Sequence, residues 1–187
     1  RTALWGSRPS RHVDRPPMAP GLRRFVLFFH ITTSVGFLGA VAAYIALAAT
    51  ALTAEPAGAS AAWTASAVVA WYVVVPLAFA SLIVGVVSGL GTPWGLFRYY
   101  WVLAKLFLTI VAVVVLLLQL ETINFIASAA LEGALPNGDH GAGGIGLLVH
   151  GVGGMVVLLI IVVLSIYKPR GLTKYGWRRQ SEQRSGA

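Results

Sequence analysis

The sequence predicts an all-α polytopic membrane protein whose four transmembrane helices form an up-down-up-down bundle. Apolar residues make up 57% of the 187 residues and charged residues only 11%, against about 45–50% and about 25% in soluble domains. Four apolar runs each reach the roughly 20 residues that a helix needs to cross a bilayer core. Most basic residues fall in the segments that would lie on one side of the membrane. The composition therefore excludes an ordinary water-soluble globule.

The four predicted spans cover about residues 25–50, 63–90, 99–120 and 144–167 within a transmembrane domain of residues 23–168. They are expected to be helices because lipid cannot satisfy backbone polar groups, and the alternating pattern of a membrane barrel is absent. Short connections favour sequential antiparallel neighbours. Residues 169–187 form a basic tail that we expect to be cytoplasmic.

The first span begins after a basic segment, residues 1–22, that we expect to be disordered because residues 1–17 are rich in Arg and Pro. Arg23-Arg24, an apolar run and Ala46-Leu47-Ala48 together look like a secretory signal. The run has about 25 residues, whereas the apolar region of a signal has roughly 7–15. We therefore predict an uncleaved first span, with Met18 as an alternative start of the chain.

The charge distribution predicts that both termini are cytoplasmic. Six Arg precede the first span, Arg98 lies in the second connection, and six Lys or Arg follow the last span. In the other two connections all the charged residues are acidic: Glu55 in one, and Glu121, Glu132 and Asp139 in the other. Basic loops stay on the cytoplasmic side, which indicates a multi-pass protein of the plasma (inner) membrane. The basic stretches are short and membrane-adjacent, so their expected partner is anionic lipid and not nucleic acid.

Two sequence features leave alternatives for the helix ends and bends. Residues 123–135 either prolong the third helix or lie on the membrane surface, before Pro136-Asn137-Gly138 ends the segment. Pro76, within the second span, predicts a kink. The kink is either purely structural or widens a cavity.

Small residues at helical spacing predict where the helices pack, because lipid gives apolar helices no hydrophobic reason to associate. Ser81, Gly85 and Gly89 are spaced four apart on the second span, and Gly146, His150 and Gly154 on the fourth. Packing grooves are the favoured interpretation of these rows. A ligand channel is the alternative.

Ionisable residues inside a span are costly and are therefore candidate functional residues. Lys105 lies near the cytoplasmic start of the third span and His30 at the same depth in the first. Lys105 either extends to the interface or faces the bundle, where Thr109, Ala112 and Gln119 continue a thin polar stripe. His30 is either a satisfied core residue or a ligand for a metal or haem iron.

The remaining signals for site chemistry are few. His150 should lie roughly 12–14 Å in depth from His30, too far for both to ligate one haem. Asp139, His140 and His150 are candidate metal ligands, but solvated loop residues are the favoured interpretation of this group. The chain has no Cys, which excludes disulfides, thiolate metal sites and cysteine nucleophiles. No phosphate loop, catalytic triad or carboxylate pair occurs, so we name no catalytic residues and expect no enzyme of soluble type.

Three segments carry a resemblance, namely Phe29-His30-Ile31-Thr32-Thr33-Ser34-Val35-Gly36-Phe37-Leu38-Gly39, Trp94-Gly95-Leu96-Phe97-Arg98-Tyr99-Tyr100-Trp101-Val102-Leu103-Ala104-Lys105-Leu106 and Tyr167-Lys168-Pro169-Arg170-Gly171-Leu172-Thr173. Over roughly residues 18–179 the chain resembles a family of small bacterial integral membrane proteins of unknown function. It is distantly similar to the copper-resistance membrane domain and to the membrane protoporphyrinogen oxidase that carries a b-type haem. The oxidase resemblance implies functional roles for a first-span His and a third-span Lys, here His30 and Lys105. The second-span histidines expected for a two-ligand haem are not found.

Three functions remain open from the sequence. The first is a haem or redox module in which His30 is an axial ligand and Lys105 pairs with a carboxylate. The second is a small transporter or ion-handling protein, acting as a homo-oligomer, with Pro76, Gln119 and the Gly-rich fourth span along its path. The third is an accessory subunit of a larger membrane complex.

Overall fold

The computed structural model describes residues 18–91, 95–133, 142–169 and 171–185, and within them the only regular elements are helices. Helix α1 (Pro20–Thr53) is followed by the nearly continuous α2 (Pro56–Val69), π-helix η1 (Ala70–Val74) and α3 (Val75–Leu90). Then come α4 (Tyr100–Leu131), α5 (Ala142–Tyr167) and the short α6 (Lys174–Ser185). The predicted all-α class is confirmed.

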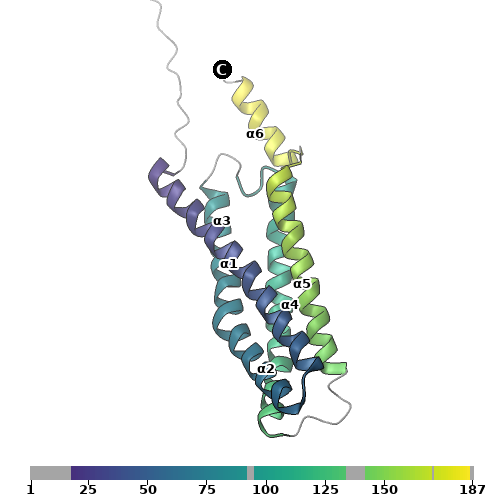
Figure 1. The fold of residues 1–187 in the computed structure, drawn as a ribbon. Coiled ribbons are helices and arrows are strands. Elements are labelled where there is room, and N and C mark those ends of the chain that lie inside the picture. Colours follow the sequence, from purple (N-terminus) through teal and green to yellow (C-terminus); the bar gives the residue numbers. More distant parts are fainter. Residues whose placement is uncertain (1–17, 92–94, 134–141, 170, 186–187) are drawn as a thin grey trace, which may run out of the picture.

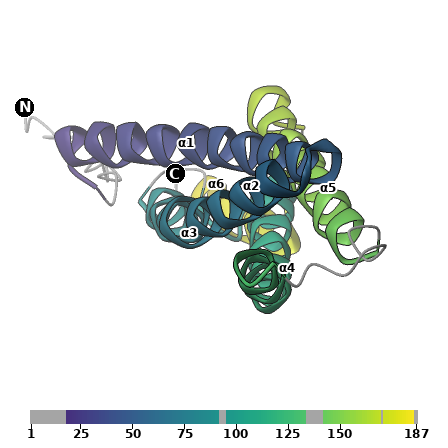
Figure 2. The same cartoon turned by 60° about the horizontal axis from the view of Figure 1, so that its bottom comes forward.

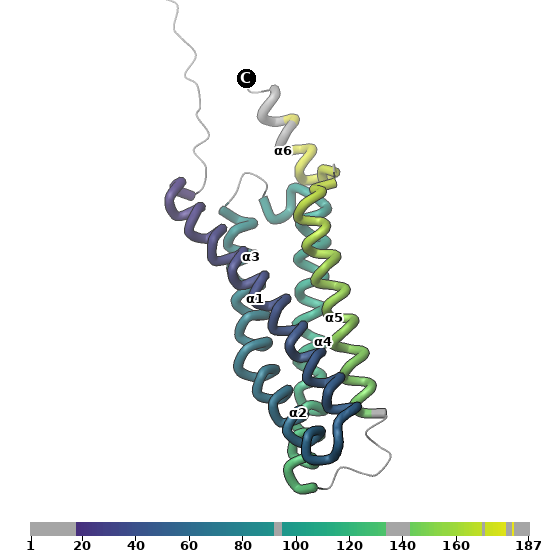
Figure 3. The backbone as a smooth tube through the Cα atoms, viewed as in Figure 1, coloured from purple at the N-terminus to yellow at the C-terminus, as the bar shows by residue number. Residues whose placement is uncertain are grey.

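The long helices form an antiparallel bundle in which each packs against its neighbours in sequence (Figures 1 and 3). Helix α1 packs against α2 and α3, these pack against α4, α4 packs against α5, and α5 closes the ring against α1. Seen from the end, α1 and α4 lie on opposite sides of the bundle (Figure 2). We call the end with Arg23, Arg98 and Lys168 the basic end, and the end with Glu55 and Glu132 the acidic end.

Four helical stretches are long and apolar enough to cross a bilayer: Pro20–Thr53, Pro56–Leu90, Tyr100–Leu131 and Gly143–Tyr167. Large apolar side chains remain exposed along them, as at Phe28 (63%), Leu118 (72%) and Phe125 (72%). Such a surface is stable against lipid and not against water. The chain is a multi-pass integral membrane protein.

The helices extend beyond the predicted spans. Helix α1 begins at Pro20, so residues 20–22 of the segment expected to be disordered are helical, because Pro is well suited to the first helical turn. The turn between the first two spans shortens to Ala54 and Glu55 because Pro56 begins the next helix. Helix α4 continues to Leu131, so the 123–135 segment prolongs the helix as far as that residue. Residues 1–17 and Pro136-Asn137-Gly138 lie outside the described residues.

The proline in the second span is preceded by a turn of π-helix. Proline has no N–H to donate, and its ring crowds the carbonyl four residues earlier, here that of Tyr72. The wider turn of η1, directly before Pro76, accommodates this mismatch. Pro76 therefore changes the local helix geometry next to Ala70 and Val74, two residues that line a cavity described below.

Close packing at the acidic end depends on Gly144 at the start of α5. A Cβ atom built there would lie 2.8 Å from the Trp63 ring and 2.9 Å from the Leu52 side chain. Trp63 is only 2% exposed, so its ring has little room to move. Any residue larger than glycine at position 144 would separate α5 from α1 and α2.

The basic tail is attached to the connection between α3 and α4 through Thr173. Its hydroxyl donates a 2.6 Å hydrogen bond to the Phe97 carbonyl and accepts one of 3.1 Å from the Gly176 amide, while its own amide donates to the Arg98 carbonyl at 3.0 Å. The bond from Gly176 caps the start of α6. The helix and its attachment are features that the sequence analysis did not identify.

We predict that Gly144→Ala is less stable than Gly146→Ala by about 1–3 kcal/mol, the usual penalty of overpacking. Both changes gain the same helix propensity, but a Cβ at Gly146 meets no atom within 4 Å. Denaturant unfolding in detergent measures the difference. Equal stability of the two variants would contradict the packing described at Trp63.

We also predict that Thr173→Val releases α6, because valine keeps the shape but can neither donate to Phe97 nor cap Gly176. Limited trypsin digestion at Lys174 and Arg178 should then become faster. Thr173→Ser, which keeps the hydroxyl, should digest at the rate of the natural protein. Slow digestion of Thr173→Val would show that the hydroxyl does not hold the tail.

Candidate functional site

The ring of His30, on α1, packs against α3 at the smallest residue available. A Cβ atom at Gly85 would lie 3.1 Å from Cε1 and 3.6 Å from Nδ1 of His30. Nδ1 is buried and has no hydrogen-bond partner among the described residues. One turn further along, Ser34 and Ser81 share a 3.0 Å hydrogen bond between the same two helices. Gly85 thus gives the histidine its place between α1 and α3.

Lys105, on α4, is directed toward α5. Its ammonium donates a 3.2 Å hydrogen bond to the Ser165 hydroxyl and lies 4.6 Å from the centre of the Trp101 ring. The Ser165 hydroxyl in turn donates to the Ile161 carbonyl at 2.8 Å. Cation–π attraction and a charge-assisted hydrogen bond therefore hold the ammonium between two helices. Of the two interpretations of Lys105, this geometry fits the bundle-facing one.

The two candidate residues do not pair: no hydrogen bond joins His30 and Lys105 in the described part of the chain. His30 contacts α3, whereas Lys105 contacts α5. Both are polar residues near the basic end of the bundle, but each contacts a different helix.

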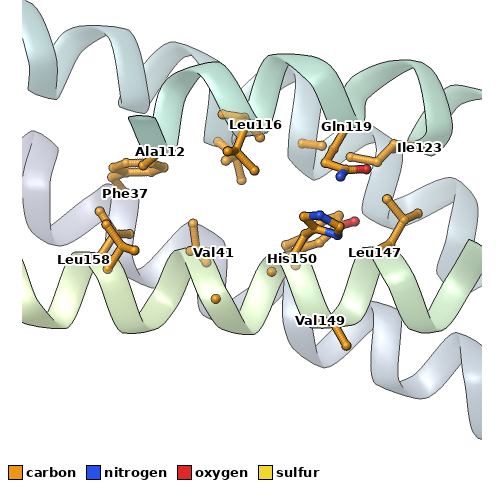
Figure 4. Close-up of a pocket in the computed structure, with 18 of the residues that line it drawn as sticks. Phe37, Val41, Ala112, Leu116, Gln119, Ile123, Leu147, Val149, His150 and Leu158 are labelled. Atoms are coloured by element: carbon orange, nitrogen blue, oxygen red, sulfur yellow. The ribbon is translucent and has the colours of Figure 1, made fainter. Parts of the chain in front are cut away.

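A cavity of about 400 Å³ lies between α1, η1, α4 and α5 (Figure 4). Its wall is mostly aliphatic, and its polar side chains are those of Tyr44, Gln119 and His150. Neither His30 nor Lys105 lines it. Cavities of roughly 300–1,000 Å³ with few polar groups are typical of small-molecule sites.

Glycines of α5 create part of this space. Gly151, Gly153 and Gly154 all line the cavity. Gly151 brings α5 against α1, since a Cβ there would lie 3.2 Å from the Tyr44 ring, while Cβ atoms at Gly153 and Gly154 would meet nothing within 4 Å. The row of Gly146, His150 and Gly154 therefore does not form the close helix contact that we expected. Two of its members, His150 and Gly154, line the cavity instead.

The hydrogen bond of His150 fixes which ring nitrogen carries hydrogen. Nδ1 lies 2.7 Å from the Gly146 carbonyl oxygen, and a carbonyl can only accept, so Nδ1 must donate. In the neutral imidazole, Nε2 then carries a lone pair and no hydrogen. His150 presents a hydrogen-bond acceptor to the cavity.

Gln119 faces His150 from the opposite wall (Figure 4). Its amide has no hydrogen-bond partner among the residues that the structure describes, although an amide offers two donor hydrogens and an acceptor oxygen. The two side chains come from α4 and α5 and occupy the part of the cavity toward the acidic end. Together with Tyr44 of α1, they are the polar side chains of an otherwise apolar cavity.

The structure gives no support for a metal site made of three or more side chains. No group of three His, Cys, Asp or Glu residues comes together in the described ranges. Asp139 and His140, two of the candidate ligands around His150, lie outside the described residues. His150 itself uses Nδ1 for the Gly146 carbonyl.

No protein family, curated protein or solved structure matches the chain in sequence or in fold. The site must therefore be interpreted from its own geometry. The sequence analysis named Gln119, Pro76 and the glycines of the fourth span only as one open alternative. The signal that could have ranked them higher is the concentration of glycines around one intramembrane histidine, in a helix opposite an intramembrane glutamine.

We predict that His30→Leu leaves the free energy of unfolding unchanged or raises it by as much as about 1 kcal/mol. Leucine removes the buried Nδ1 that lacks a partner, and exchanging an unsatisfied polar group for an apolar one is seldom unfavourable. Unfolding in detergent gives the measurement, with Thr33→Val as control because the Thr33 hydroxyl already bonds to the Phe29 carbonyl. A loss above about 1 kcal/mol would show that His30 makes a stabilising polar contact.

Proposed function

We propose that the protein binds a small, mostly apolar molecule within the membrane, in the cavity between α1, η1, α4 and α5. The observation that carries this proposal is the cavity of about 400 Å³ with Gln119 and His150 on opposite walls. A molecule bound in the cavity gains dispersion contacts with its apolar wall. The side chains of Gln119 and His150 can in turn form hydrogen bonds with it. A ligand with an apolar body and one polar group would satisfy both.

The position of the cavity supports uptake from the lipid phase. Val111 and Val115 of α4 and Val149 of α5 line the cavity and are also exposed, by 38%, 37% and 61%. Residues that both line the cavity and are exposed support an opening of the cavity toward lipid. A molecule dissolved in the bilayer can reach Gln119 through it without passing through water.

We further propose that the protein lies in the plasma (inner) membrane with its basic end in the cytoplasm. Arg23, Arg24, Arg98, Lys168 and Lys174 lie at that end, and Glu55 and Glu132 at the other. Retention of basic residues on the cytoplasmic side supports this orientation. The cavity, which lies toward the acidic end, would then be in the outer half of the bilayer. Binding from the outer leaflet fits a role in transport or sensing of such a molecule.

A second candidate function rests on His30. Its buried Nδ1 without a partner is a free nitrogen of the kind that binds haem iron, and Lys105 nearby can pair with a propionate. Neither His30 nor Lys105 lines the cavity. The cavity is therefore the better supported site. An absorption spectrum of haem-supplemented protein tests this candidate, and a Soret band lost in His30→Ala would favour it.

We predict that Gly154→Leu abolishes saturable binding of 4-hexylphenol by the protein in lipid nanodiscs. The leucine side chain enters the cavity, because nothing lies within 4 Å of a Cβ at Gly154. Gly39→Leu is the matched control, since Gly39 is exposed on α1, also has free space around its Cβ and does not line the cavity.

Binding is measured with radiolabelled ligand, and empty nanodiscs correct for partition into lipid. Gly39→Leu should bind as the natural protein does. Binding that survives in Gly154→Leu, or that is lost equally in both variants, would contradict the location of the site.

A further inference from the structure

We infer that the ligand of this cavity carries a hydroxyl group, as in a phenol or an alcohol, and that this group binds between His150 and Gln119. The inference rests on the proposed function and specifies its substrate class. It follows from the hydrogen-bond capacities of the two side chains and from the lack of acidic side chains in the described wall of the cavity.

The first requirement comes from His150. Because Nδ1 donates to the Gly146 carbonyl, the neutral ring has only an acceptor left, at Nε2. A ligand that binds here must therefore donate a hydrogen bond. Ketones, ethers, esters and hydrocarbons have no such donor and would leave Nε2 unpaired beside an apolar wall, although His150 itself is exposed.

The second requirement comes from Gln119. Its amide group is without a partner in the described part of the chain and offers both donors and an acceptor. A hydroxyl oxygen can accept from the Gln119 amide while its hydrogen is donated to His150. One atom thus serves both walls of the cavity, which suits a ligand whose remaining surface is apolar.

The wall excludes the main competing donors, the charged amines. No Asp or Glu among the residues that the structure describes lines the cavity, so an ammonium ion there would lose its hydration without gaining a counter-charge. A neutral hydroxyl carries a far smaller desolvation cost. The apolar remainder of the wall, including Phe37, Leu116 and Leu158, fits a ring with a short alkyl chain.

The test compares 4-hexylphenol with its methyl ether, 4-hexylanisole, on the full-length protein in nanodiscs. The two molecules share ring and chain but only the phenol donates a hydrogen bond. We expect the phenol to bind about tenfold more tightly after correction for lipid partition, the effect of one hydrogen bond. Equal saturable affinities, both lost in Gly154→Leu, would overturn the hydroxyl inference and leave the proposed function intact. Absence of saturable binding for both molecules would overturn the proposed function as well.

Two variants identify the groups that recognise the hydroxyl. His150→Phe removes the acceptor and keeps an aromatic ring, and should reduce the preference for the phenol to about twofold or less. Gln119→Leu should lower the affinity for the phenol more than that for the ether, because the phenol can both accept from and donate to the Gln119 amide whereas the ether can only accept. Thr109→Val is the control on α4, because the Thr109 hydroxyl bonds to the Lys105 carbonyl of its own helix and does not line the cavity.

Because His150→Phe alone could fail to fold, the Gln119→Leu result stands as an independent readout. An undiminished phenol preference in either folded variant would overturn the assignment of the hydroxyl to this pair.

Discussion

The structure depends on a single constraint of the bilayer: apolar helices gain nothing by hiding their side chains from lipid, so close contact must hold them together. In this chain small residues provide that contact. Gly144 admits the Trp63 ring and Gly85 admits His30, while Ser34 and Ser81 add a hydrogen bond between α1 and α3. The longer polar reach of Lys105 to Ser165 joins α4 to α5 near the basic end. These contacts add to a core of buried apolar side chains that all the long helices share.

The same choice of residues leaves space where no partner approaches. Helix α5 touches α1 at Gly151, yet Gly154, less than one turn away, faces a cavity. On the opposite side, the π-helical turn before Pro76 places Ala70 and Val74 along that cavity. A bundle assembled through separate glycine contacts can therefore enclose a binding site without losing its ring of helix contacts. His150 and Gln119 give this otherwise apolar space a defined polar end.

Much of the fold could be predicted from the sequence, because run length and hydropathy alone determine which segments can cross a bilayer. The ends of the helices were harder to predict. Pro20 and Pro56 begin helices earlier than the apolar runs do, since helix geometry continues into the interface. The sequence could not predict whether the glycine row of α5 packs against a helix. The rotation of a helix about its axis decides whether Gly154 meets a neighbour or a cavity. The attachment of the tail through Thr173 arises from contacts across 75 residues or more, for which a local pattern carries no signal.

The central claim is that His150 presents an unprotonated Nε2 to the cavity, ready to accept a hydrogen bond. The most direct measurement is the ¹⁵N NMR spectrum of ring-labelled histidine in nanodiscs, with His150 assigned by comparison with His150→Phe. The account predicts hydrogen on Nδ1, none on Nε2, and a change in the Nε2 resonance when 4-hexylphenol is added but not when 4-hexylanisole is added. Hydrogen on Nε2 of the neutral ring, or a resonance that neither molecule changes, would contradict it.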